Sequence, residues 1–191
     1  MKLISIRNPW AWFLYTGLKQ YETRGWKTPY RGPLAIHVTR NRMDGDSMAV
    51  LEKARARCGE RFPAKKLHLL DEMRGKIVAV GILADCIPMH SINPSATEAM
   101  LGDFSPGRYA LVIERLQRLP EFVEIPRGAQ GYPVAVHDEV RNRILRLIDD
   151  RLPPSMRDIF HERHDGKLGD FEKLSSRDKP PVTHETASKR K

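Results

Sequence analysis

The sequence predicts a mixed α+β fold: a mostly antiparallel, barrel-like sheet with short helices inserted between its strands. Stretches with the alternation or the apolar density of strands recur from residue 3 to residue 136. They follow one another in runs, without the regular alternation of strand and helix that a parallel sheet needs. We therefore expect five or six strands in one sheet.

The first elements are a strand at residues 3–6 and a short apolar helix at residues 9–16. Pro9 suits the first position of a helix, and Asn8 can cap its exposed amides. Gly17 can end the helix in the left-handed conformation.

The strand predicted at residues 21–26 carries the side chains best suited to binding or catalysis. Alternation along a strand places Glu22, Arg24 and Trp26 on one face. Lys19 precedes the strand and joins this face only if the alternation is broken before it. A carboxylate between two cations is either a salt-bridged strut or part of a charged pocket.

The later elements follow from periodicity and from termination signals. Ser95 and Glu98 have the spacing of a capping box, and Pro120 should interrupt a strand. Helices are expected at residues 46–57, 63–75 and 95–102. Further strands are expected at residues 33–39, 76–87 and 107–119, with a last one after a glycine-rich turn within residues 128–136.

Composition divides the chain into three parts. Residues 1–137 contain every predicted strand and form one domain. Residues 138–161 form a helical extension. Residues 162–191 carry many charges and few large apolar side chains, so they cannot bury enough surface to order themselves, and we expect a flexible tail.

Composition also excludes several classes of function. No run of 18 apolar residues exists and no signal peptide is recognisable, so we expect a cytoplasmic protein without a membrane partner. Cys58 and Cys86 are too few and too far apart for a disulfide framework or a zinc knuckle. The His161-x-x-His164-Asp165 pattern lacks a further ligand nearby, so we expect neither a metal nor a cofactor.

The chain of 191 residues has a net charge of +9, and its cations are concentrated in the first quarter. Before Asp44 it carries eight lysines and arginines against one acid, Glu22, with tryptophans and tyrosines interleaved. Cations neutralise phosphates and aromatic rings stack on bases, so this composition suits nucleic acid. A solvated basic surface over buried aromatic residues is an equally open interpretation.

Several ordered pieces of the sequence carry a family resemblance. They are Asn8-Pro9-Trp10-Ala11, Gly17-x-Lys19-x-x-Glu22-x-Arg24-x-Trp26, Arg31-Gly32-Pro33-Leu34-Ala35-Ile36-His37, Gly75-Lys76-Ile77-Val78-Ala79-Val80-Gly81 with Asp85-Cys86, Pro106-Gly107-Arg108-Tyr109-Ala110-Leu111, and Gly128-x-x-Gly131. In order and spacing over residues 3–137 they resemble the ASCH family (activating signal cointegrator-1 homology), a branch of the PUA-like β-barrel folds. The resemblance implies a cleft lined by the Gly-x-Lys-x-x-Glu-x-Arg segment that binds RNA or other nucleic acid.

Some members of the family that this chain resembles are enzymes, namely N4-acetylcytidine amidohydrolases and a ribonuclease. The amidohydrolase branch carries Lys and Thr where this chain has Lys19 and Glu22, so the hydroxyl nucleophile is missing here. Thr23 does not replace it, because neighbouring residues of a strand point to opposite faces. The form with Glu22 is closer to the eukaryotic coactivator branch, which is regarded as a nucleic-acid-binding module.

Three hypotheses follow. The first is RNA binding in a basic cleft, with the candidate binding residues Lys19, Arg24, Trp26, Arg31, His37 and Arg40. The second is hydrolysis of RNA or of a modified nucleoside in the same cleft, with Lys19 and Glu22 as candidate catalytic residues. The third is a protein-interaction module that docks a partner through the extension. Each candidate residue also has a structural interpretation, as a strut, a core side chain or a solvated charge.

Overall fold

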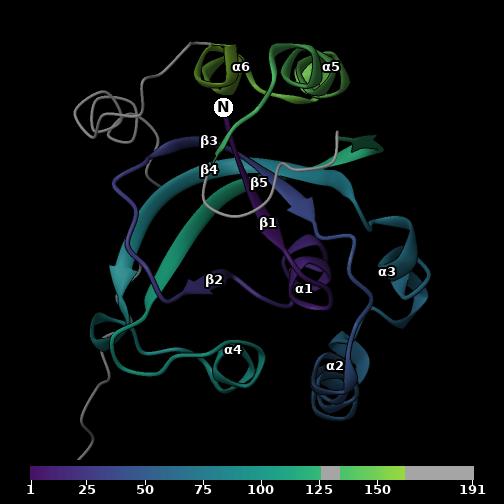
Figure 1. The fold of residues 1–191 in the computed structure, drawn as a ribbon, viewed down its shortest axis with the longest axis vertical. Helices are drawn as coiled ribbons and strands as arrows, with labels where there is room; N and C mark the ends of the chain where they lie inside the picture. The colour runs from purple at the N-terminus through teal and green to yellow at the C-terminus, as the bar shows by residue number, and fades with distance from the viewer. Residues whose placement is uncertain (126–133, 162–191) are drawn as a thin grey trace, which may run out of the picture.

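The computed structural model describes residues 1–125 and 134–161, which are organised on a six-stranded sheet (Figure 1). The strand order is β2-β5-β4-β3-β1-β6. Among these strands β1 and β3 are parallel, and the other neighbouring pairs are antiparallel. The strands are β1 (Lys2–Ile6), β2 (Tyr21–Arg24), β3 (Gly32–Val38), β4 (Lys76–Pro88), β5 (Tyr109–Glu124) and β6 (Val134–Ala135).

The prediction of a mixed fold with a mostly antiparallel sheet is confirmed, but closure into a barrel is not. The long strands β4 and β5 curve around the core, and their pairing shifts register at three places, as bulges do when they bend a sheet. The end strands β2 and β6 have four and two residues, and they are not paired with each other in the described part of the chain. The sheet is therefore curved and open.

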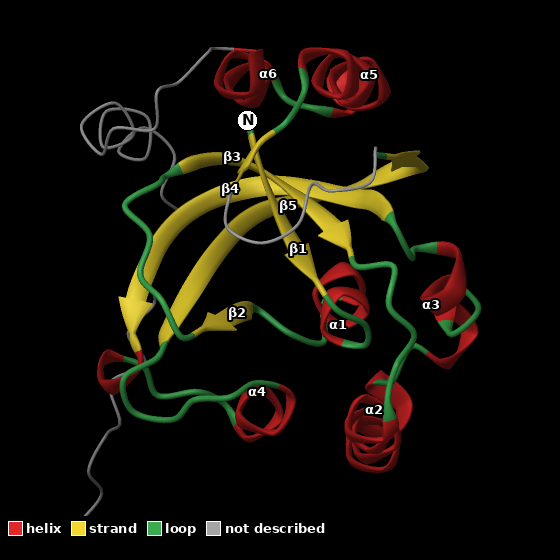
Figure 2. Ribbon diagram, in the orientation of Figure 1, coloured by secondary structure: helices red, strands yellow, loops and turns green. Residues whose placement is uncertain are grey.

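Helices cover both faces of the sheet (Figure 2). The first four lie on the concave side and the last two on the convex side. They are α1 (Trp10–Thr16), α2 (Gly45–Cys58), α3 (Leu69–Glu72), α4 (Ala96–Leu101), α5 (Asp138–Ile148) and α6 (Pro154–His161). None of the described helices is long and apolar enough to cross a membrane.

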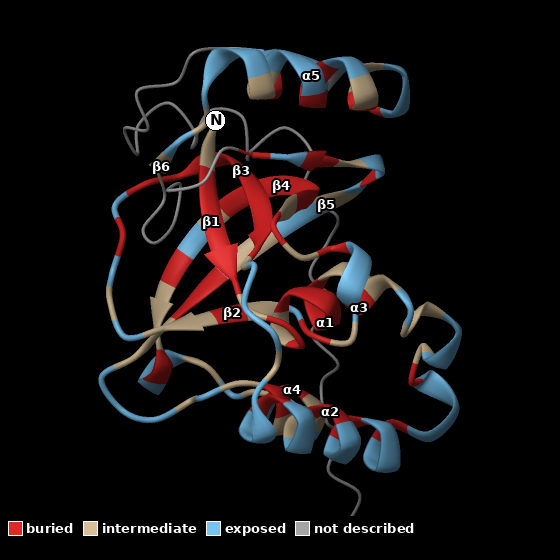
Figure 3. Ribbon diagram, turned by 45° about the vertical axis from the view of Figure 1, so that its right-hand side comes forward, coloured by how far each residue is buried: buried red, intermediate tan, exposed pale blue. Residues whose placement is uncertain are grey.

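Strand alternation divides the core into two layers. Ile4 and Ile36 face the concave side and pack with Trp12 of α1, which is fully buried. Leu3 and Ala35 face the other way and join the cluster formed with α5 and α6. Figure 3 shows the consequence, because the central strands are buried while the outer faces of the helices are exposed.

The helix predicted at residues 63–75 is instead divided into one 3₁₀ turn (Ala64–Lys66) and the four-residue helix α3. Two of its carbonyl oxygens are taken by side chains from another part of the chain. The Trp12 indole donates to Lys66 O at 2.9 Å, and Asn8 Nδ2 donates to Leu70 O at 2.7 Å. Asn8 therefore does not cap α1, which begins after Pro9 without a side-chain cap.

The strand predicted to end before Pro120 continues to Glu124. Pro120 lies where the pairing of β5 with β4 shifts register, between Arg118 and Val123. A proline without an N–H is tolerated at such an irregularity. The predicted tail (162–191) and the glycine-rich turn (128–131) lie outside the described residues, and the division of the chain into three parts stays a prediction.

The predicted capping box at the start of α4 is half formed. Ser95 Oγ accepts from Glu98 N at 3.1 Å, as the pattern requires. The Glu98 carboxylate, however, accepts from the backbone N–H groups of Gln20 and Tyr21, at 2.9 and 3.0 Å. It also lies 3.4 Å from Lys19 Nζ, so this carboxylate joins α4 to the start of β2.

We predict that Glu98→Gln destabilises the protein by about 3–5 kcal/mol, as expected when one partner of a buried ion pair is removed. The Lys19 side chain is fully buried and would lose its counter-charge, whereas an amide oxygen still accepts from the β2 backbone. Urea unfolding measures the change. The matched control is Asp103→Asn in the exposed pair with Arg108, where we expect a loss below about 1 kcal/mol. Equal losses in the two variants would contradict the prediction.

His37 makes the stability depend on pH. It is buried, its Nδ1 lies 2.9 Å from Ser5 Oγ, and burial lowers its pKa from 6.5 to about 4. Between about pH 6.5 and 4 the unfolded chain therefore binds a proton that the folded chain does not, so acid destabilises the fold.

We predict that His37 removes about 3 kcal/mol of stability between pH 7.5 and pH 4, from 1.36 kcal/mol for each pKa unit. The His37→Asn variant keeps a polar atom close to Nδ1 and does not titrate. Urea unfolding of both proteins across this range isolates the contribution of His37, because the carboxylates are common to them. A difference in stability that stays constant with pH would contradict the assignment.

Candidate functional site

A pocket of about 410 Å³ lies where β1, β2, α1, α2 and α4 approach one another. Its wall contains both charged and apolar side chains. The charged residues are Arg7, Glu22, Arg24, Asp103 and Arg108. The remaining residues are Ile6, Trp10, Thr23, Val50, Met100, Leu101 and Gly102.

An ion pair on β2 forms the inner part of this pocket. Glu22 Oε1 lies 2.9 Å from Arg24 Nη2, which also donates to Ser5 O at 2.8 Å. The two side chains share a face because they are two positions apart on the strand. Glu22 is buried and Arg24 is partly buried, with the guanidinium carbon 5.8 Å from the centre of the Trp26 ring. The pair is therefore both a strut and a wall of the pocket.

Two exposed ion pairs lie at the rim. Arg7 Nη1 is 2.9 Å from Asp44 Oδ2, and Arg108 Nε is 3.1 Å from Asp103 Oδ2. Hydrogen bonds from Ser47 and Ser105 lower the pKa values of Asp44 and Asp103, so both carboxylates are charged at neutral pH. Exposed pairs contribute little to stability, so either arginine can exchange its carboxylate for an anion of a ligand. Arg108 also donates to Asp103 O and Thr23 O, at 3.2 and 3.4 Å, and these bonds hold it at the rim.

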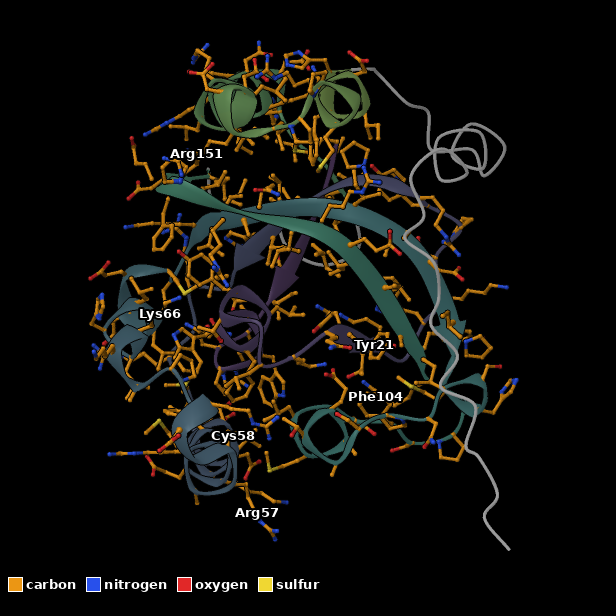
Figure 4. The ribbon with its side chains drawn as sticks, turned by 180° about the vertical axis from the view of Figure 1, so that it is seen from behind. Tyr21, Arg57, Cys58, Lys66, Phe104 and Arg151 are labelled. Atoms are coloured by element: carbon orange, nitrogen blue, oxygen red, sulfur yellow. The ribbon has the colours of Figure 1, made fainter. Side chains whose placement is uncertain are left out.

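Lys19 lies outside this pocket. Its amine donates to Tyr21 O and pairs with Glu98, and the residue lines a separate pocket of about 380 Å³ beside β5. The amine is 3.2 Å from the point where a Cβ on Gly102 would lie, so a glycine separates it from the first pocket. Figure 4 shows Tyr21 and Phe104 beside α4 in this region. Lys19 and Glu22 therefore do not converge on one cavity.

The other predicted binding residues are distributed over the fold. Arg31 donates to Asp85 Oδ1 at 2.7 Å and to two backbone oxygens, which makes it a buried strut. His37 is buried beside Ser5, and Arg40 donates to Ile125 O at 3.0 Å. Of the predicted site residues, only Glu22 and Arg24 line the pocket among the described residues. Trp26 does not line it, but its ring lies beside the Arg24 guanidinium.

Several residues of the pocket were not predicted from the sequence. Arg7 and Arg108 were assigned no role from the sequence, and Trp10 was expected to be a core residue of the short apolar helix. A signal for Trp10 was present, because residues two apart on a helix point in nearly opposite directions. Trp12 is fully buried in the core, whereas Trp10 packs against the core and is only partly buried.

The structure gives no metal site among the residues that it describes. His161 Nε2 lies 2.7 Å from Asp149 Oδ1, so an ion pair or hydrogen bond accounts for this side chain. His164 and Asp165 of the same sequence pattern lie outside the described residues.

Comparison with known families identifies the domain that contains the pocket. The model of the ASCH domain matches residues 4–118, which include every residue that lines the pocket. None of the curated proteins compared with the chain matches it. The match covers more than half of the chain and implies a PUA-like fold, in agreement with the mixed architecture described above. The chain belongs to the ASCH domain family.

Proposed function

We propose that this ASCH domain binds single-stranded RNA and holds one nucleotide in the pocket between β2 and α4. The observation that carries the proposal is the convergence of three arginines and the partly buried Trp10 on one cavity. Its volume of about 410 Å³ falls within the usual range for sites that enclose a small organic group.

The rim arginines are the proposed phosphate contacts. The planar guanidinium of Arg7 or Arg108 can donate two hydrogen bonds to one phosphate. Each would exchange an exposed carboxylate partner for the phosphate, at little cost in stability. Release of counterions from the RNA adds to the affinity and makes it depend on salt.

The inner wall is the proposed contact for the base. Trp10 offers a ring on which an unpaired base stacks, with Met100 and Val50 completing an apolar surface. Glu22 and Arg24 offer an acceptor and a donor to the polar edge of that base. This pair is buried more deeply than the rim pairs, so it stays formed while the rim pairs open.

RNA binding fits the geometry better than the hydrolase hypothesis. Hydrolysis as the sequence suggested it requires Lys19 and Glu22 at one reacting group. The Lys19 amine is instead paired with Glu98 and hydrogen-bonded to Tyr21 O. The protein-interaction hypothesis concerns α5 and α6, which lie on the opposite side of the sheet from the pocket.

We predict that Arg108→Gln weakens binding of single-stranded RNA about tenfold, the loss expected for one charged hydrogen bond. The slope of log affinity against log salt should fall by about one. Fluorescence anisotropy with labelled RNA at graded salt measures both quantities. Arg143→Gln is the matched control, because Arg143 also forms an exposed pair, with Glu121, on the far side of the sheet. Equal losses in the two variants, or binding by the wild type that is insensitive to salt, would overturn the proposal.

We predict that Trp10→Leu weakens RNA binding by about 1–3 kcal/mol, the range measured for loss of one base–aromatic stack, while the salt slope stays unchanged. Leucine retains apolar contact with the core, so the fold should survive. The same anisotropy titration measures the loss, and quenching of tryptophan fluorescence by RNA should decrease in parallel. Unchanged affinity would exclude stacking on this ring. A separate incubation of the pure protein with RNA and with acetylated cytidine tests the hydrolase hypothesis. Release of a product from either compound would favour it over RNA binding alone.

A further inference from the structure

A further pocket, of about 330 Å³ and distinct from the Lys19 pocket beside β5, has no role in the proposed function and is called the second pocket here. It is lined by Asn8, Arg42, Met43, Met48, Leu70, Asp71 and Arg74. Two chain connections place the pockets side by side. Arg7 lines the first pocket and Asn8 the second, and Asp44, which pairs with Arg7, directly follows Met43. Consecutive Cα atoms are about 3.8 Å apart, so the Arg7–Asp44 ion pair joins a residue of the first pocket to the neighbour of a residue of the second.

Asn8 gives the second pocket an unused acceptor. The residue is 1% exposed, and its Nδ2 is occupied by Leu70 O at 2.7 Å. Its Oδ1 is buried and has no hydrogen-bond partner within the described ranges. A buried acceptor without a partner costs stability, so this wall of the second pocket is locally under-satisfied in the free protein.

The walls and the rim of the second pocket suit a flat aromatic group carrying an anion. Met48 is 43% exposed and is the only large apolar residue that is exposed in the described part of the chain. With Met43 it offers flexible thioether groups, which pack well against aromatic rings. Arg42 is exposed at the rim, and Arg74 pairs with the exposed Asp71 at 3.2 Å. Both arginines can reach an anion.

We propose that the second pocket holds the nucleotide adjacent to the one in the first pocket, so that the domain engages two consecutive nucleotides of one RNA strand. This inference rests on the proposed function. The linking phosphate contacts Arg7, and the next phosphate contacts Arg42. The second base packs against Met43 and Met48.

The test compares ligands of different length. Arg42→Glu should weaken binding of a mixed-sequence hexaribonucleotide about tenfold and leave binding of ribonucleoside monophosphates unchanged within about twofold. Met48→Ala should also weaken hexaribonucleotide binding, without reducing the salt slope. Arg55→Glu is the matched control, because Arg55 is an exposed residue of α2 that lines neither pocket. It makes the same change of charge and should reduce hexaribonucleotide binding much less.

Titration followed by NMR chemical shifts measures both affinities and reports which backbone amides respond. Equal effects of Arg42→Glu and Arg55→Glu, in a protein whose hexaribonucleotide binding still falls with Arg108→Gln, would overturn the second subsite and leave the proposed function intact. An equal loss for monophosphates and for the hexaribonucleotide would also overturn it. Absence of hexaribonucleotide binding by the wild type would overturn both proposals.

Discussion

The carboxylate of Glu98 holds the two walls of the first pocket together. β2 has four residues and lies at the end of the sheet, where it pairs with β5 alone. Such a strand is marginal unless its other side is covered. Glu98 reaches from α4 to the Gln20 and Tyr21 amides, and its charge keeps the Lys19 amine buried. The position of α4 beside β2, and with it the pocket between them, depends on this contact.

The electrostatics of the pocket are more balanced than a net charge of +9 suggests. Each of its three arginines already pairs with a carboxylate. The pairs differ in exposure, and this difference decides what they can do. The exposed rim pairs are weak in water, so a phosphate competes with them readily. The inner pair is shielded and keeps its geometry, which suits it to recognising a polar edge. The site therefore separates exchangeable charge from fixed charge.

Local patterns predicted most of the elements and one face of β2, but not the assembly of the site. Alternation placed Glu22 and Arg24 together correctly, because that relation lies within one strand. The partner of Lys19 is 79 residues away, and no local pattern indicates it. Likewise, the helix expected at residues 63–75 was broken by side chains of Asn8 and Trp12, which capture its carbonyl oxygens. The pocket is formed by such contacts between residues far apart in the chain, and local sequence patterns do not indicate them.

The outer edge of β2 also limits how a ligand can bind. Tyr21 N–H donates to Glu98, and Tyr21 O accepts from Lys19. Farther along, Thr23 O accepts from Arg108 at 3.4 Å, and Thr23 Oγ1 accepts from Asp103 N. These contacts occupy backbone groups that an added strand would need, so binding of an extended peptide by strand addition is disfavoured. A ligand at this edge meets side chains instead. Recognition then rests on charge and on ring stacking, which are the interactions that unpaired RNA offers.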